Sequence, residues 1–321
     1  MRFGAPGVQR NVLSAAGAAI PLLHDCTPTR ETPDGADSWP RATVSSLALV
    51  ALLGSGAFAP ARLAAQKPTE DEATRLAKAT QNPVADLVSL PFQFNFNTGG
   101  GLGDRTFFNL NFQPVVPVKG VLAKWTIIAR AIIPYVSLPG PNDTRQGGLA
   151  DIQGQFFLTP AKAGKLIWGV GPVLSVPTAT ADLARTGSWA IGPTGVFLTN
   201  AGPWVLGALI NNLWTFADDG GAPEVNQFTM QPFINYNFGH GWAATSAPLI
   251  TANWDAASGE EWTVPLGIGI SKTTVFNRRP ISVGAQYYHN VDHPTASAAN
   301  QLRVQVSLLY PSGPKPAAKP Q

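Results

Sequence analysis

The chain has 321 residues and a formal net charge of +3, with only 13 % charged residues, 32 glycines and 29 prolines. The charged fraction is about half that of an ordinary soluble domain, yet the mean hydropathy is only +0.05, which fits strands that alternate lipid-facing and polar side chains. The charge is diffuse and forms no basic cluster, so nucleic acid is not an expected partner. Cys26 is the single cysteine, which excludes a disulfide framework and a cysteine-based metal site.

The first 65 residues precede the structured part that we expect. Residues 1–40 show no periodicity and have two interpretations, an unusually long leader or a start assigned too far upstream, of which we favour the second. Residues 41–65 begin with a basic residue, Arg41, which is followed by an apolar core over 47–59 and by small residues before a cut after Ala65. That pattern is typical of a signal peptide, rather than of a short buried helix in a soluble protein. The core falls short of the ~18 residues of a spanning helix.

Residues 66–85 are polar and compatible with a helix that ends at Asn82-Pro83, because the residue before a proline avoids the α region. We expect a periplasmic lead-in segment or a short plug there.

Strand-like alternation begins at residue 86. Residues 225–255 show it most clearly, with Phe228, Ile234 and Tyr236 on one parity and polar residues on the other, then a tight turn at Gly239-His240-Gly241 and a second alternating arm ending near Trp254. A period of two indicates a strand with one apolar face, and each arm is long enough to cross a bilayer. Twelve such runs follow one another, over residues 87–97, 105–116, 122–136, 148–158, 165–176, 188–199, 203–216, the two arms of 225–255, 261–271, 280–290 and 301–310.

The connections alternate in length. Those after even-numbered runs are mostly short, as at 200–202, whereas those after odd-numbered runs are longer, as at 137–147 and 177–187. Bacterial barrels have short periplasmic turns and longer outside loops. The sequence therefore predicts an all-β fold, a transmembrane antiparallel up-and-down β-barrel of about 12 strands over residues 86–310, in contact with the lipid of a Gram-negative-type outer membrane.

The last run ends on Tyr310, as closing strands of such barrels usually do, and we expect the barrel-assembly machinery to recognise it there. Residues 311–321 are expected to be disordered.

Prolines interrupt the pattern, although proline cannot donate to a sheet ladder and a closed barrel has no edge to receive it. Bulges or local bends are expected at these sites, and a shift of one residue would exchange the two faces. The prolines concerned are Pro134, Pro172, Pro193, Pro232, Pro248 and Pro265.

The parity opposite the apolar residues predicts the inner wall, and it is rich in neutral amides. Two functions suit such a wall. It could form a narrow pore with weak charge selectivity for neutral solutes, or amides could fill and close the lumen. We favour the pore. The candidate lining residues are Lys124, Arg130, Asp151, Gln153, Gln227, Gln231, Asn235, Asn237, Asn253, Asp255 and Arg303.

Catalytic and metal-binding patterns are weak. His289, Asp292 and His293 run into a loop without a complete ligand set, and no histidine lies in mid-strand near a serine, as a hydrolase would require. The glycine-rich residues 99–103 precede no helix, so a phosphate site is not expected. We predict no enzyme activity, no catalytic residue, no cofactor and no metal.

Several segments resemble a bacterial outer-membrane family whose type is the phenol meta-pathway degradation protein, with members labelled transporter or neuromedin U. The resemblance covers residues 76–310 and is carried by LAKATQNPVADLVSLPFQFNFN, GLADIQGQFFLTP, WGVGPVLSVPTAT, VNQFTMQPFINYNF and QLRVQVSLLYP. It implies a transporter-like barrel linked to uptake of aromatic or other apolar compounds, and it assigns no functional residues. The alternative function is a structural or interaction barrel that binds through its outer loops.

Overall fold

The computed structural model describes residues 71–100, 105–140, 144–162, 164–218, 220–277 and 279–311. The predicted leader, the signal peptide and residues 312–321 of the predicted C-terminal tail lie outside these residues, whereas Pro311, the first residue of that tail, ends strand β15. The described part comprises one helix, α1(Glu72–Thr80), a short 3-10 helix, η2(Asp182–Ala184), and the strands β1(Leu87–Thr98), β2(Phe107–Phe112), β3(Val115–Leu122), β4(Trp125–Pro139), β5(Arg145–Leu149), β6(Ile152–Pro160), β7(Leu166–Val176), β8(Ser188–Ala201), β9(Trp204–Asp218), β10(Asn226–Gly239), β11(Trp242–Ser246), β12(Ile250–Asn253), β13(Trp262–Phe276), β14(Arg279–Asp292) and β15(Asn300–Pro311).

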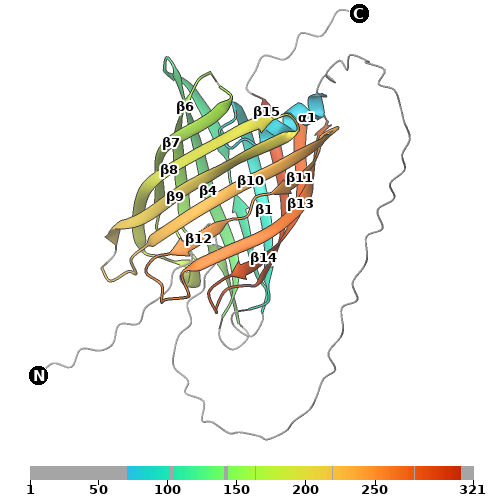
Figure 1. The fold of residues 1–321 in the computed structure, drawn as a ribbon. Coiled ribbons are helices and arrows are strands. Elements are labelled where there is room, and N and C mark those ends of the chain that lie inside the picture. Colours follow the sequence, from blue (N-terminus) through green and yellow to red (C-terminus); the bar gives the residue numbers. More distant parts are fainter. Residues whose placement is uncertain are drawn as a thin grey trace, which may run out of the picture. The chain divides into compact units, whose positions relative to one another are not determined.

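These strands form a closed antiparallel barrel with twelve crossings, which confirms the predicted fold (Figure 1). Three crossings consist of two strands each, β2 with β3, β5 with β6, and β11 with β12. The barrel closes where β1 pairs with β15, from Leu87 opposite Pro311 to Thr98 opposite Asn300. No helix in the described residues is long and apolar enough to cross a membrane.

The two ends of the barrel differ. One end, here the short-turn end, carries turns such as residues 202–203 and 240–241, and α1 lies there (Figure 1). The other, here the long-loop end, carries residues 177–187, 254–261 and 293–299. In bacterial barrels the short turns face the periplasm.

The outer surface is an apolar belt with aromatic residues toward both ends. Ile268, near the middle of β13, is 65 % exposed, and its neighbours Leu266 and Ile270 are also exposed. Trp204 and Trp242 begin strands at the short-turn end, whereas Trp189, Trp214 and Trp254 are exposed toward the long-loop end. Aromatic girdles around an apolar band are typical of transmembrane barrels.

The expected irregularity occurs at some of the prolines, whereas the β7–β8 register runs unshifted through Pro172 and Pro193 and the β9–β10 register through Pro232. β11 ends before Pro248 and β12 begins after it, so the partners of β10 change from Ser246, opposite Ile234, to Ile250, opposite Met230. At Pro265 the pairing of β13 with β14 shifts register. The inward parity of each strand is the same on both sides of its proline, so the predicted faces are not exchanged.

Pro172 and Pro193 lie opposite each other on β7 and β8, and each follows a glycine. A Cβ on Gly171 would lie 1.8 Å from the Phe156 carbonyl oxygen, and one on Gly192 would lie 1.7 Å from the Asn212 carbonyl oxygen. Glycine therefore lets the backbone approach its neighbour where proline cannot bond to it.

Helix α1 begins at Asp71, whose carboxylate accepts a hydrogen bond from the Thr74 backbone N–H at 2.9 Å. This is an N-cap interaction. The helix ends at Gln81, the residue before Asn82-Pro83, so the chain leaves the helix where the proline requires it.

Candidate solute pathway

The inner wall encloses two cavities. The loop-side cavity, with a volume of about 60 Å³, is lined by Asn95, Asn109, Gln153 and Arg303 among others. The helix-side cavity, of about 170 Å³, lies between α1 and the middle of the barrel and is lined by Gln81, Phe233, Asn235 and Gln305 among others. The residues that line both are Gln93, Gln113, Arg130, Leu209 and Gln231. The two cavities therefore adjoin each other at these five residues.

A row of hydrogen-bonded side chains crosses this boundary. Arg130 donates from Nη1 to Gln155 Oε1 at 3.2 Å and from Nη2 to Gln113 Oε1 at 2.8 Å. Gln113 donates to Gln93 Oε1 at 3.0 Å, and Gln93 donates to Gln305 Oε1 at 3.0 Å. Because each amide both donates and accepts, the row is continuous across several strands and holds Arg130 in place.

Arg303 is the centre of a second network. It donates to Asn95 Oδ1 at 3.1 Å, to Gln301 Oε1 at 3.0 Å and to the Ala247 carbonyl oxygen at 3.0 Å. Ala247 lies in the interruption between β11 and β12, so its carbonyl is free for a side chain. The Arg303 guanidinium also lies 5.0 Å from the centre of the Tyr288 ring, and the Tyr288 hydroxyl accepts from the Ala247 backbone N–H at 3.0 Å.

The predicted lining residues occupy different places. Arg130, Gln153, Gln231 and Arg303 line the loop-side cavity, and Arg130, Gln231 and Asn235 line the helix-side cavity.

Three further candidates lie on inward positions but serve other contacts. Asn237 bonds to Gln81 of the helix, Asp151 bonds to a loop, and Asn253 accepts a hydrogen bond from the Asp255 backbone N–H. Gln227 is half-buried near the long-loop end of β10 and lines neither cavity.

Lys124 and Asp255 do not lie on the wall, which corrects our expectation for them. Both are exposed in turns, Lys124 before β4 begins and Asp255 after β12 ends. Both residues lie beyond the ends of the strands, where side chains no longer alternate between lumen and lipid.

Sequence reasoning missed that part of the lumen is apolar. Ile128, Phe157, Leu198, Val205 and Phe233 belong to one buried cluster on the inner face. The signal was present on β10, where Phe233 has the same parity as Gln231 and Asn235. On β8 and β9 both parities are apolar, so alternation could not reveal which side chains point inward.

The loop of residues 177–187 packs onto the inner wall at the long-loop end. Its Ala181 and Ala184 are buried against Phe107, Val136 and Leu138, which line the loop-side cavity. The loop therefore narrows the lumen at this end.

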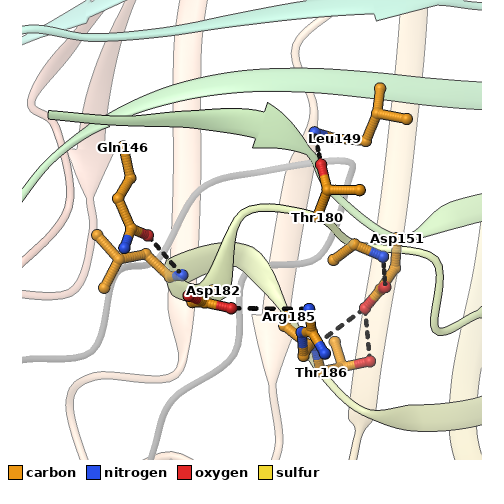
Figure 2. A network of polar contacts seen from close by, with 9 residues as sticks. Gln146, Leu149, Asp151, Thr180, Asp182, Arg185 and Thr186 are labelled. Carbon is orange, nitrogen blue, oxygen red and sulfur yellow. Dashed lines mark hydrogen bonds and ion pairs between the residues drawn. The ribbon is translucent and has the colours of Figure 1, made fainter.

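Asp151 anchors this loop (Figure 2). One carboxylate oxygen accepts from the Ala179 N–H at 2.9 Å, and the other accepts from the Thr186 N–H at 3.0 Å and the Thr186 hydroxyl at 2.6 Å. Asp151 is 2 % exposed. Thr180 adds a bond from the Leu149 N–H to its hydroxyl at 2.9 Å.

Helix α1 closes part of the short-turn end. Lys78 Nζ donates to the Gly202 carbonyl at 2.8 Å, and Gln81 exchanges hydrogen bonds with Asn237 at 3.1 Å. The Asp71 carboxylate accepts from the His240 N–H at 2.8 Å. This bond, followed by that from Thr74, lowers the pKa of Asp71 to about 2.

The histidines have ordinary partners. His289 Nδ1 lies 3.0 Å from Asn300 Oδ1, His293 Nδ1 lies 2.9 Å from the Pro294 carbonyl, and His240 is a turn residue with φ of 52°. Within the described ranges, His, Cys, Asp and Glu form no group of three or more that could hold a metal ion.

No protein-family model matches the chain, and no curated protein matches it. Among solved structures, the COG4313 outer membrane channel from Pseudomonas putida F1 matches with a TM-score of 0.53 and 12 % identity over 70 % of this chain and 94 % of that chain. The outer membrane phospholipase dimer of Salmonella typhi with bound calcium matches with a TM-score of 0.40 and 14 % identity, over 74 % of this chain and 96 % of that chain. Salmonella typhi OmpF in complex with daunomycin matches with a TM-score of 0.32 and 9 % identity, over 70 % of this chain and 96 % of that chain. The first match shows a shared fold, and the other two are too distant to carry an argument.

Proposed function

We propose that this protein is an exported outer-membrane channel or transporter through which small neutral solutes, including aromatic or other apolar ones, permeate passively. The observation that carries the proposal is the pair of cavities, which share five lining residues. The lining amides offer donors and acceptors to neutral solutes.

The apolar belt and the closing strand support the proposed location. The exposed aliphatic side chains of β13 suit contact with lipid. Tyr310, near the end of β15, is 38 % exposed, and the Arg279 guanidinium lies 6.0 Å from its ring centre. We propose that the barrel-assembly machinery recognises this strand. The resemblance to the phenol meta-pathway transporter family motivates the choice of aromatic solutes.

Liposome swelling tests the channel, with full-length protein compared with a variant that lacks residues 71–81. Removing α1 deletes Ala77, Thr80 and Gln81 from the wall of the helix-side cavity, so small neutral solutes should enter the liposomes faster. Lys78→Ala, which removes no residue from the wall of the helix-side cavity, is the matched control and should behave like wild type. Both forms must show heat-modifiable gel mobility. Folded barrels that never cause swelling, with or without α1, would refute the channel.

A filled lumen favours the second candidate, an interaction barrel that binds through its loops. The buried cluster around Phe157 and Leu198 occupies part of the interior, and the loop-side cavity measures only about 60 Å³. Deleting residues 137–147 or 177–187 should then abolish binding of the partner without altering permeability. A rise in permeability on deleting 177–187 would contradict this candidate and support the channel.

A further inference from the structure

The two cavities carry charge of one sign. Among the described residues that line them, Arg130 and Arg303 are charged and no aspartate or glutamate is present. Arg303 is 5 % exposed, and taking an ionised group out of water is costly unless an opposite charge pairs with it. We propose that Arg130 binds the carboxylate of a small organic anion, and that Arg303 adds positive charge in the adjoining loop-side cavity. This inference rests on the proposed channel and adds small organic anions to its solutes.

The protein partners of both arginines are neutral. Arg130 donates to Gln113 and Gln155, and Arg303 donates to Asn95, Gln301 and a backbone carbonyl. Neutral oxygens orient a guanidinium, but they do not cancel its charge. Each guanidinium has five N–H donors in a planar fork that matches a carboxylate, and the contacts found in the described part of the chain use two of them in Arg130 and three in Arg303.

The inward carboxylate nearest the long-loop end does not fill this role. Both oxygens of Asp151 already accept hydrogen bonds from Ala179 and Thr186, and Asp151 lines neither cavity. The positive charge of the arginines therefore faces the cavities, where an anion from solution can reach it.

The helix-side cavity indicates the body of such an anion. It borders Arg130, includes the apolar side chains of Val115, Leu209 and Phe233, and has a volume of about 170 Å³. An apolar cavity of about 150 Å³ can hold benzene. A monocarboxylate with a compact apolar body, such as benzoate, would place its body there and its carboxylate against Arg130.

Equilibrium binding to the refolded full chain in detergent micelles tests this site, with benzoate and its neutral counterpart benzamide titrated calorimetrically and empty micelles as blanks. Benzoate should bind roughly tenfold or more tightly than benzamide, as expected for charge-assisted hydrogen bonds. Arg130→Gln should remove this preference by weakening benzoate binding tenfold or more relative to benzamide binding. Lys124→Gln, which removes the same charge from an exposed turn, is the matched control and should keep it.

Equal binding of the two ligands to the wild type, absence of benzoate binding, or a preference that persists in Arg130→Gln would each overturn the site. If Arg130→Gln does not fold, Arg130→Lys, which keeps the charge and loses the fork, should still weaken benzoate. Binding needs no membrane, so the two proposals fail separately. A barrel that discriminates but never causes swelling refutes the channel, whereas swelling without discrimination refutes the carboxylate site.

Discussion

Replacing Asp151 by asparagine should release the loop of residues 177–187 from the inner wall. The carboxylate accepts three hydrogen bonds on its two oxygens, whereas the asparagine amide offers one oxygen and one NH₂ group. In either orientation of the amide, at least one donor, from Ala179 or Thr186, faces another donor. A buried donor left unpaired costs about 1–3 kcal/mol, which corresponds to a local opening roughly fivefold to 150-fold more frequent.

Native-state hydrogen exchange measures this opening at the Ala179 and Thr186 amides, which should exchange faster by that factor while the β8 and β9 amides keep their rates. Asp182→Asn is the control in the same loop, because the Asp182 ion pair with Arg185 spans 3.6 Å and is exposed, and exposed pairs contribute little. Unchanged exchange in Asp151→Asn, or an equal effect of Asp182→Asn, would refute the anchoring role.

Three further predictions follow from the fold. Gly171→Ala should destabilise the barrel by about 1–3 kcal/mol in urea titrations followed by gel mobility, because the added Cβ would lie 1.8 Å from the Phe156 carbonyl oxygen. Gly195→Ala is the control, because the atom nearest to its added Cβ is 4.0 Å away. Equal stabilities of the two variants would contradict the close approach at Gly171. Ile268→Arg should lower the free energy of unfolding of the barrel in lipid by about 2–4 kcal/mol, whereas Ala257→Arg, in an exposed loop, should leave it almost unchanged. An unchanged free energy of unfolding in Ile268→Arg would refute the lipid-facing assignment. The Asp71 pKa of about 2 lies below the ordinary 3.8, so the contribution of this carboxylate to helix docking is present above about pH 4 and is lost as the pH falls toward 2. Pepsin should therefore cut near Leu76 faster at pH 2 than at pH 4 relative to Asp71→Asn, in which this contribution is absent at both pH values, and identical profiles would exclude this carboxylate.

The fold was predictable because the lipid constrains one face of every strand. Alternation such as Phe228, Ile234 and Phe238 against Thr229, Asn235 and Asn237 marked the strands, and the loop lengths marked the two ends. The interruption at Pro248 was predictable as a break, because a proline cannot bond to its neighbour. Its consequence for Arg303 was not, since only the fold brings the freed Ala247 carbonyl to β15.

The candidate site was predictable in kind but not in detail. Parity identified Arg130, Gln231 and Arg303 as inward residues. It could not show that the Phe157 cluster fills one side of the lumen, because inward and outward positions of β8 and β9 are both apolar. Nor could it reveal that Asp151 serves a loop, since its partners Ala179 and Thr186 are 28 and 35 residues further along the chain.

The contacts of α1 also have a consequence for the order of assembly. Its hydrogen bonds reach Gly202, Asn237 and His240, which lie 124, 156 and 169 residues away in sequence. Contacts of such long range form late in folding, because the entropy of closing the intervening chain must be met first. The short-turn end therefore stays open until β8 to β11 are in place. Before the helix docks, water can leave the lumen through this end while the amide side chains of the lumen form hydrogen bonds with one another.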